Sequence, residues 1–166
     1  MKAEPERSGC FGILLAPFLG GARKPVSEFP YGKRDAFLSP AEISFFHVVK
    51  LILPPEYHLI TKIRIGDLVY VKRPHENQGA RNRIDRKHID FVVCDAKTMD
   101  PVLAIELDDK SHQRKDRAER DAFVDGVFET AGIPLVHIPA AKGYQVDEIR
   151  RVLREVWLSE ERSSQD

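Results

Sequence analysis

The chain has 166 residues, of which 42% are hydrophobic and 31% are charged, so it is long enough to bury the core of one domain. Its 26 Lys and Arg residues equal its 26 Asp and Glu residues, which excludes a global charge signal for nucleic acid and leaves only local patches. The two cysteines, Cys10 and Cys94, lie far apart without CxxC spacing. This excludes a disulfide scaffold or zinc knuckle and indicates a reducing compartment, the cytoplasm.

Residues 1–35 are expected to form an N-terminal extension and a linker. The longest apolar run, CFGILLAPFLGGA over residues 10–22, contains Pro17 and a pair of glycines and is shorter than the ~20 residues of a membrane-spanning helix. We therefore expect no transmembrane helix and no signal peptide. Three alternatives remain for this run: docking on the domain or a partner, weak contact of residues 11–22 with the inner membrane from its cytoplasmic side, or disorder.

The first predicted helix begins after Ser39. The sequence Ser-Pro-Ala-Glu supplies an N-cap serine, Pro40 at the first helical position and Glu42 where it can close a capping box. Pro54 and Pro55 end the helix. Its expected inward positions recur at helical spacing and are Ile43, Phe46, Val49 and Leu53.

Residues 57–65 are predicted to be a strand, with residues 67–71 as an extension after a bend at Gly66. A long basic loop with almost no apolar residue should follow over residues 72–87. Its cations are Lys72, Arg73, Arg81, Arg83, Arg86 and Lys87. Two interpretations of this loop stay open: a solvated surface insertion, or a set of phosphate contacts beside a nucleic-acid site.

Two apolar strands, residues 88–95 and 102–107, are predicted to pair as a hairpin, and each carries one acid in a hydrophobic run. These acids are Asp90 and Glu106. One register places them directly opposite each other, with Cα atoms roughly 4.5–5.5 Å apart, whereas a slip of one residue would separate them. Because two carboxylates so placed repel each other, this register predicts a cation between them or a proton retained on one.

The remaining elements are a helix over about residues 113–131, a strand over residues 133–138 and a helix over residues 146–158, followed by a polar tail. The right-handed crossover rule makes the strand parallel to residues 102–107. The expected fold class is therefore α/β, with a mixed four- to five-stranded sheet flanked by helices on both faces in one domain over residues 36–158.

Four stretches carry a resemblance to known proteins: SPAEISFFHVV, RKHIDFVVCD, LAIELDDKSHQRKDRAERDAFVD and AGIPLVHIP. They look like the bacterial domain-of-unknown-function 2726 family and are similar to proteins related to very-short-patch-repair endonucleases. With the element order, they also resemble the core of the PD-(D/E)xK phosphodiesterase superfamily. The resemblance covers about residues 38–158 and implies a restriction-endonuclease-like fold and a DNA-processing or repair nuclease.

The resemblance also implies residue roles. Asp90 and Glu106 become ligands of Mg²⁺ or Mn²⁺, and Glu42 matches a position that adds a further carboxylate. Asp108 stands where the superfamily has a lysine that orients water and stabilises the phosphorane; an aspartate there would bind metal or repel phosphate. The candidate substitutes for this lysine are Lys110, His112 and Arg117, of which His112 is favoured as a base near neutral pH.

Each of these residues also has a structural alternative. Glu42 suits a helix cap, His112 the start of a helix, and Asp108 a surface position near a helix N-terminus. His137 is expected to be structural, and His88 is an outside candidate beside the site.

Two functions remain open. The first is a Mg²⁺- or Mn²⁺-dependent endonuclease whose phosphate contacts are the basic loop and Arg117. The second is a non-catalytic module of the same fold that binds nucleic acid or a protein and is held near a membrane or a complex by residues 10–22. No glycine-rich nucleotide loop is present, so no nucleotide cofactor is expected. The sequence does not determine an oligomeric state.

Overall fold

The structure is a computed structural model that describes residues 29–108 and 115–163. The chain divides into two units, residues 1–35 and 36–166, and the described helices and strands all lie in the second. In chain order they are α1 (Pro40–Ile52), β1 (Tyr57–Arg64), α2 (Ile65–Leu68), α3 (Ala80–Asp85), β2 (His88–Asp95), β3 (Pro101–Asp108), α4 (Lys115–Ala131), β4 (Leu135–Pro139) and α5 (Val146–Ser163).

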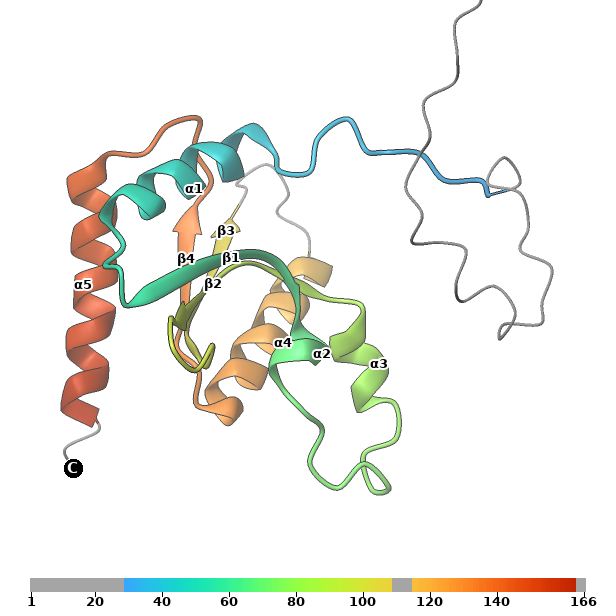
Figure 1. Cartoon of the computed structure of the whole chain (residues 1–166). Coiled ribbons are helices and arrows are strands. Elements are labelled where there is room, and N and C mark those ends of the chain that lie inside the picture. Colours follow the sequence, from blue (N-terminus) through green and yellow to red (C-terminus); the bar gives the residue numbers. More distant parts are fainter. Residues whose placement is uncertain (1–28, 109–114, 164–166) are drawn as a thin grey trace, which may run out of the picture. The chain divides into compact units, whose positions relative to one another are not determined.

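The strands form one four-stranded sheet in the order β1-β2-β3-β4 (Figure 1). β1 and β3 both pair antiparallel to β2, whereas β4 pairs parallel to β3. The parallel pairing follows from the α4 crossover, because a right-handed β-α-β connection returns the chain in the same direction. The predicted α/β class with a mixed sheet is therefore confirmed.

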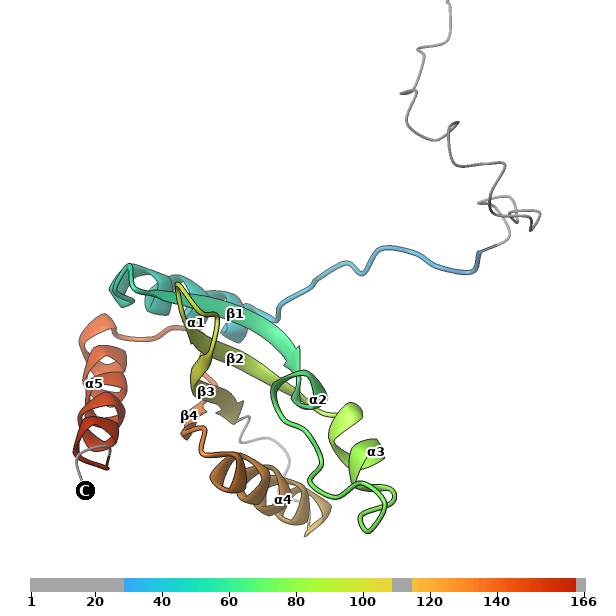
Figure 2. The ribbon, with the colours of Figure 1, turned by 60° about the horizontal axis from the view of Figure 1, so that its bottom comes forward.

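Helices cover both faces of the sheet, as Figures 1 and 2 show together. On one face, α1 and α5 pack over a core that includes Phe45, Phe91 and Leu153, each fully buried. On the other, α4 packs with α2 and α3 over residues such as Val92 and Phe128. Because β2 contributes to both cores, it is an almost continuous apolar run in which an acid such as Asp90 is conspicuous.

The predicted capping box at the start of α1 is confirmed. The Ser39 N–H donates to Glu42 Oε2 at 2.6 Å, and the Glu42 N–H donates to Ser39 Oγ at 3.3 Å. The predicted inward face is partly wrong, since Phe45 is buried while Ile43 is 44% exposed. The helix is rotated because Glu42 itself lies on the buried face, at 8% exposure.

Replacing Ser39 with Ala is expected to lower the free energy of unfolding by about 1 kcal/mol, because the Glu42 N–H loses its acceptor at the helix start. Urea unfolding followed by circular dichroism measures the change. Ser44→Ala, inside the same helix, is the control and should be neutral or slightly stabilising, since alanine favours helix interiors. Equal unfolding midpoints for Ser39→Ala and wild type would show that the cap contributes nothing.

Two predictions in the segment between β1 and β2 are wrong. Residues 65–68 form helix α2 instead of continuing the strand, and α3 interrupts the predicted basic loop. A Cβ added to Gly66 would lie 2.3 Å from Asp85 Oδ1, so a side chain at this position would require the Asp85 carboxylate to turn away. α3 is anchored by Ile84, at 6% exposure, and one apolar residue produces no periodic signal in a sequence.

The last helix is longer than predicted. α5 continues to Ser163, so most of the expected polar tail from residue 159 is helical, because Glu and Arg sustain a helix without apolar periodicity. None of the described helices is both long and apolar enough to cross a membrane. The apolar run at residues 10–22, and with it the predicted membrane or docking contact, lies outside the described residues.

Candidate functional site

The register of β2 and β3 brings the two strand acids together. Phe91 pairs with Ile105 and Val92 with Ala104, so the next position in this register places Asp90 opposite Glu106. This is the register that the sequence analysis considered. A β-bulge between Val93 and Cys94 lies toward the hairpin turn and leaves these pairs in register.

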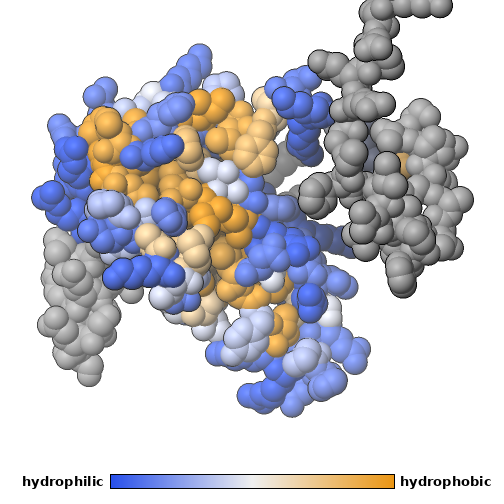
Figure 3. Space-filling view, viewed as in Figure 1, coloured by the Kyte–Doolittle hydropathy of each residue, from blue (hydrophilic) through white to orange (hydrophobic). Residues whose placement is uncertain are grey.

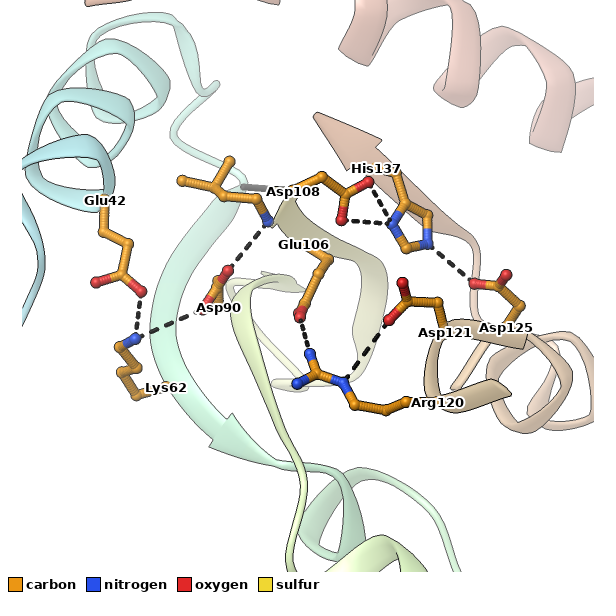
Figure 4. Close-up of polar contacts among 10 residues, drawn as sticks. Glu42, Lys62, Asp90, Glu106, Asp108, Arg120, Asp121, Asp125 and His137 are labelled. Carbon is orange, nitrogen blue, oxygen red and sulfur yellow. Dashed lines mark hydrogen bonds and ion pairs between the residues drawn. The ribbon is translucent and has the colours of Figure 1, made fainter. Parts of the chain in front are cut away.

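Asp90 is held by contacts from two neighbouring strands (Figure 4). Its Oδ2 accepts a hydrogen bond from the Leu107 N–H at 3.0 Å, and its Oδ1 lies 3.5 Å from Lys62 Nζ. Burial raises the pKa of Asp90 above its usual value, although the Leu107 N–H and the Lys62 charge act in the opposite direction. Asp90 is thus a fixed, largely desolvated carboxyl group at the end of the central strands.

Lys62 links this carboxylate to α1. Its ammonium contacts Glu42 Oε1 as well as Asp90, and Glu42 therefore caps α1 and pairs with a cation at the same time. Burial opposes the charge on Lys62, but the hydrogen bond to Glu42 and the negative charges of Asp90 and Glu42 together outweigh it and raise the pKa of Lys62. Burial acts to raise the pKa of Glu42, but the hydrogen bonds from Lys62 and Ser39 together lower it.

The backbone at Lys62 is unusual, with a φ of +57° inside strand β1. A left-handed conformation costs a residue with a side chain about 1–2 kcal/mol. Such strain is tolerated where the surrounding structure enforces it, and it clusters at functional sites. Here it accompanies an ammonium placed between Glu42 on α1 and Asp90 on β2.

Glu106 points toward α4, away from the Lys62 contacts. Its Oε1 accepts a hydrogen bond from Arg120 Nη2 at 3.2 Å, while its Oε2 is buried without a hydrogen-bond partner among the described residues. Burial, and then the negative charge of Asp90, raise the pKa of Glu106 to about 7. In the absence of a metal, one of the two opposed acids therefore keeps its proton up to near neutral pH, which was one of the two predicted outcomes.

Asp108 pairs with His137, a histidine that was expected to be structural. His137 Nδ1 lies 3.2 Å from both carboxylate oxygens of Asp108, and its Nε2 lies 2.9 Å from Asp125 Oδ1. Burial opposes the positive charge, but these carboxylates raise the pKa of His137. The parallel register of β3 and β4 pairs His137 with Glu106, which brings His137 near Asp108 two residues further along β3. The predicted parallel strand was therefore the sequence signal from which this contact could have been inferred.

The predicted phosphate contacts of the basic loop separate into three groups. Arg83, Arg86 and Lys87 line one groove together with Arg120. Arg73 and Arg81 instead form ion pairs with neighbouring acids, Glu76 at 3.2 Å and Asp85 at 3.4 Å. Lys72 lines a second, apolar groove.

Several other residues predicted for the site are not found in it among the residues that the structure describes. His112 and Lys110 lie outside the described residues, as does the side chain of Arg117. His88 is exposed on its strand. Sequence reasoning missed Lys62, Arg120 and His137, which reach the acids from β1, α4 and β4.

A preformed metal cage is absent from the part of the chain that the structure describes, since no three of its His, Cys, Asp or Glu side chains are placed so that they could hold a metal ion together. The carboxylates of Glu42, Asp90 and Glu106 instead share two cationic side chains, Lys62 and Arg120. Any metal at this site would therefore bind through one or two carboxylates and water.

Comparison with known proteins identifies one family. Residues 34–156 match the sequence profile described as protein of unknown function (DUF2726), which confirms that part of the resemblance. No curated protein and no solved structure matches the chain. The relationship to PD-(D/E)xK enzymes and to repair endonucleases is not shown by these comparisons.

Proposed function

The chain belongs to the DUF2726 family, and from its site we propose that it is a metal-dependent nuclease with a restriction-endonuclease-like fold, which hydrolyses phosphodiester bonds in DNA. The observation that carries this proposal is the opposition of Asp90 and Glu106 at the end of two central strands. A fold gains no stability from two opposed acids, so a role in binding a cation explains their position.

The chemistry of the site fits Mg²⁺ or Mn²⁺. Mg²⁺ commonly binds through one or two carboxylates and retains several waters, so Asp90 and Glu106 suffice as protein ligands. Glu42 is a neighbour of this pair, because Lys62 contacts both Glu42 and Asp90. Glu106 Oε2 is a buried oxygen with no hydrogen-bond partner among the described residues, a state that favours acquiring a ligand. Oxygen ligands favour these hard ions over zinc. A metal bound here would supply Lewis-acid stabilisation and a more acidic water.

The protein's own side chains supply the remaining requirements. The Leu107 N–H orients Asp90, and Arg120 orients Glu106. Lys62 places a positive charge beside Asp90, where it can stabilise the negative charge that builds up on a phosphorane. His137 lies between Asp108 and Asp125, so its positive charge offsets part of the repulsion of phosphate expected from an aspartate in the lysine position.

One observation favours a second candidate, a non-catalytic nucleic-acid-binding module. Asp90 and Glu106 each already have a cationic neighbour, Lys62 and Arg120. If these ion pairs persist when metal and nucleic acid are present, the acids have a structural role and the cationic groove alone contacts the ligand.

The test is cleavage of supercoiled plasmid and of single-stranded DNA by the pure full-length protein with Mg²⁺ or Mn²⁺. Cleavage should disappear in EDTA and in both Asp90→Ala and Glu106→Ala. Asp100→Ala, in the turn at the other end of the hairpin, is the matched control and should cut like wild type. Cleavage that persists in Asp90→Ala would place the active site elsewhere. Absence of both cleavage and Mn²⁺ binding in wild type would favour the non-catalytic module.

A further inference from the structure

Two grooves of different character lie side by side between α3 and α4. The first, of about 690 Å³, is mostly apolar and is walled by residues including Val69, Ile84 and Val127. The second, of about 460 Å³, is lined mainly by cationic side chains. Phe123 lines both grooves. On the face shown in Figure 3, an orange band of apolar side chains reaches the lower part of the molecule, bordered by hydrophilic side chains.

The cationic groove is prepared for an anion. The Arg83 guanidinium lies 4.0 Å from the centroid of the Phe123 ring, and the Lys87 ammonium lies 5.6 Å from it. These cation–π contacts hold two positive charges over one aromatic ring. No ion pair joins Arg83, Arg86 or Lys87 to a carboxylate among the described side chains. Glu119 also lines the groove, but one carboxylate among four cationic side chains leaves an excess of positive charge, which repels itself until a further anion binds.

The cationic groove continues toward the strand acids. Arg120 lines it and also donates a hydrogen bond to Glu106 Oε1 at 3.2 Å. A phosphate chain that follows the groove would therefore reach Arg120 directly beside the proposed catalytic carboxylates.

We propose that these grooves bind an unpaired nucleic-acid strand, with its phosphates on Arg83, Arg86, Lys87 and Arg120 and one base in the apolar groove beside Phe123. An unpaired strand presents both phosphates and aromatic faces. A duplex keeps its bases stacked inside, and would use the cations while leaving the apolar groove empty. This inference rests on the proposed function and names its substrate class, a single strand or a frayed end.

The binding test uses the full-length protein in EDTA, so that no cleavage occurs, and follows fluorescence anisotropy of labelled oligonucleotides. A single strand should bind at least about tenfold more tightly than a blunt duplex of the same length. A strand of the same length made of abasic nucleotides should bind about tenfold more weakly than the normal strand. Equal affinities for single strand and duplex, or for normal and abasic strands, would overturn the proposal. So would the absence of any binding by wild type.

Gly126 allows the apolar groove to be filled without disturbing the fold. It lines that groove, and a Cβ added there meets no atom within 4 Å. Gly126→Leu should therefore fold, weaken binding of the normal strand about tenfold, and leave binding of the abasic strand unchanged. Gly126→Ala, which adds only a methyl group, is the control and should bind like wild type. If a folded Gly126→Leu variant binds the strand as wild type does, no base occupies the apolar groove and the proposal is overturned. The groove would then have another occupant, such as an apolar peptide.

The cations are tested by the salt dependence of binding. Arg83→Gln with Lys87→Gln should weaken both normal and abasic strands and reduce the slope of log affinity against log salt by roughly 1.4, because each lost phosphate contact on a single strand contributes about 0.7. Arg151→Gln with Arg154→Gln, exposed on α5, is the charge-matched control. An unchanged slope in the groove variant would contradict the phosphate path.

The two proposals fail in different ways. Strand binding that depends on Gly126 and Arg83, together with no cleavage under any metal, would overturn the nuclease while leaving the strand groove intact. The opposite result is metal-dependent cleavage that requires Asp90 but proceeds equally in Gly126→Leu and on single-stranded and duplex DNA. That result would overturn the proposed strand binding while supporting the nuclease proposal.

Discussion

Glu106→Gln is expected to raise the free energy of unfolding by about 3 kcal/mol above pH 8 in EDTA, while wild type and variant should be equally stable near pH 4. The reason is that burial and the charge of Asp90 raise the pKa of Glu106 from 4.5 to about 7 in the folded protein. Between these two values the folded state binds more protons than the unfolded state. Wild type therefore loses stability as pH rises through this window, and glutamine, which carries no charge, does not.

Urea unfolding at a series of pH values measures this difference directly. The gap between variant and wild type should open above about pH 4.5 and level off above pH 7, following the two pKa values. Glu129→Gln, an exposed position on α4, is the matched control and should keep the wild-type pH dependence. If Glu106→Gln and wild type are equally stable at pH 9, the proposed desolvation of this carboxylate is wrong.

Lys62→Met is expected to reduce cleavage about 100-fold, the usual scale for losing one charge-stabilising donor, without weakening Mn²⁺ binding. The ammonium lies between Glu42 and Asp90. Its removal takes a positive charge away from the phosphate while leaving both carboxylates free to attract a cation. A residue that merely maintained the fold would instead affect metal binding and cleavage together.

The measurement pairs cleavage rates with Mn²⁺ titration by electron paramagnetic resonance and with thermal unfolding. Lys62→Gly serves as a second variant, because glycine readily adopts the φ of +57° found at this position and so protects the fold. Lys97→Met, in the turn at the far end of the hairpin, is the control. If both Lys62 variants cleave at the wild-type rate, Lys62 only forms a structural ion pair. If they cleave faster, its ammonium blocks the metal.

Local signals in the sequence determined most of the elements. The capping box at Ser39 and Glu42 identified the start of α1, because N-terminal hydrogen bonds depend on residues three apart. Apolar runs identified β2 and β3, and the crossover rule predicted the parallel pairing of β4. Asp90 and Glu106 could be singled out as a pair because register in a short hairpin depends on its turn and its alternating pattern.

The tertiary structure alone decided which cations meet these acids and where a ligand can lie. These cations are Lys62, Arg120 and His137, which come from three elements far apart in the sequence. No periodic pattern specifies their contacts with the acids. The positive φ at Lys62 is likewise not signalled by the sequence, because lysine has no preference for the left-handed region. The grooves beside Phe123 likewise depend on tertiary packing, because their walls combine side chains of α3 and α4. Charge compensation and cavity shape depend on distances between elements, and these are set when the sheet and its helices pack together.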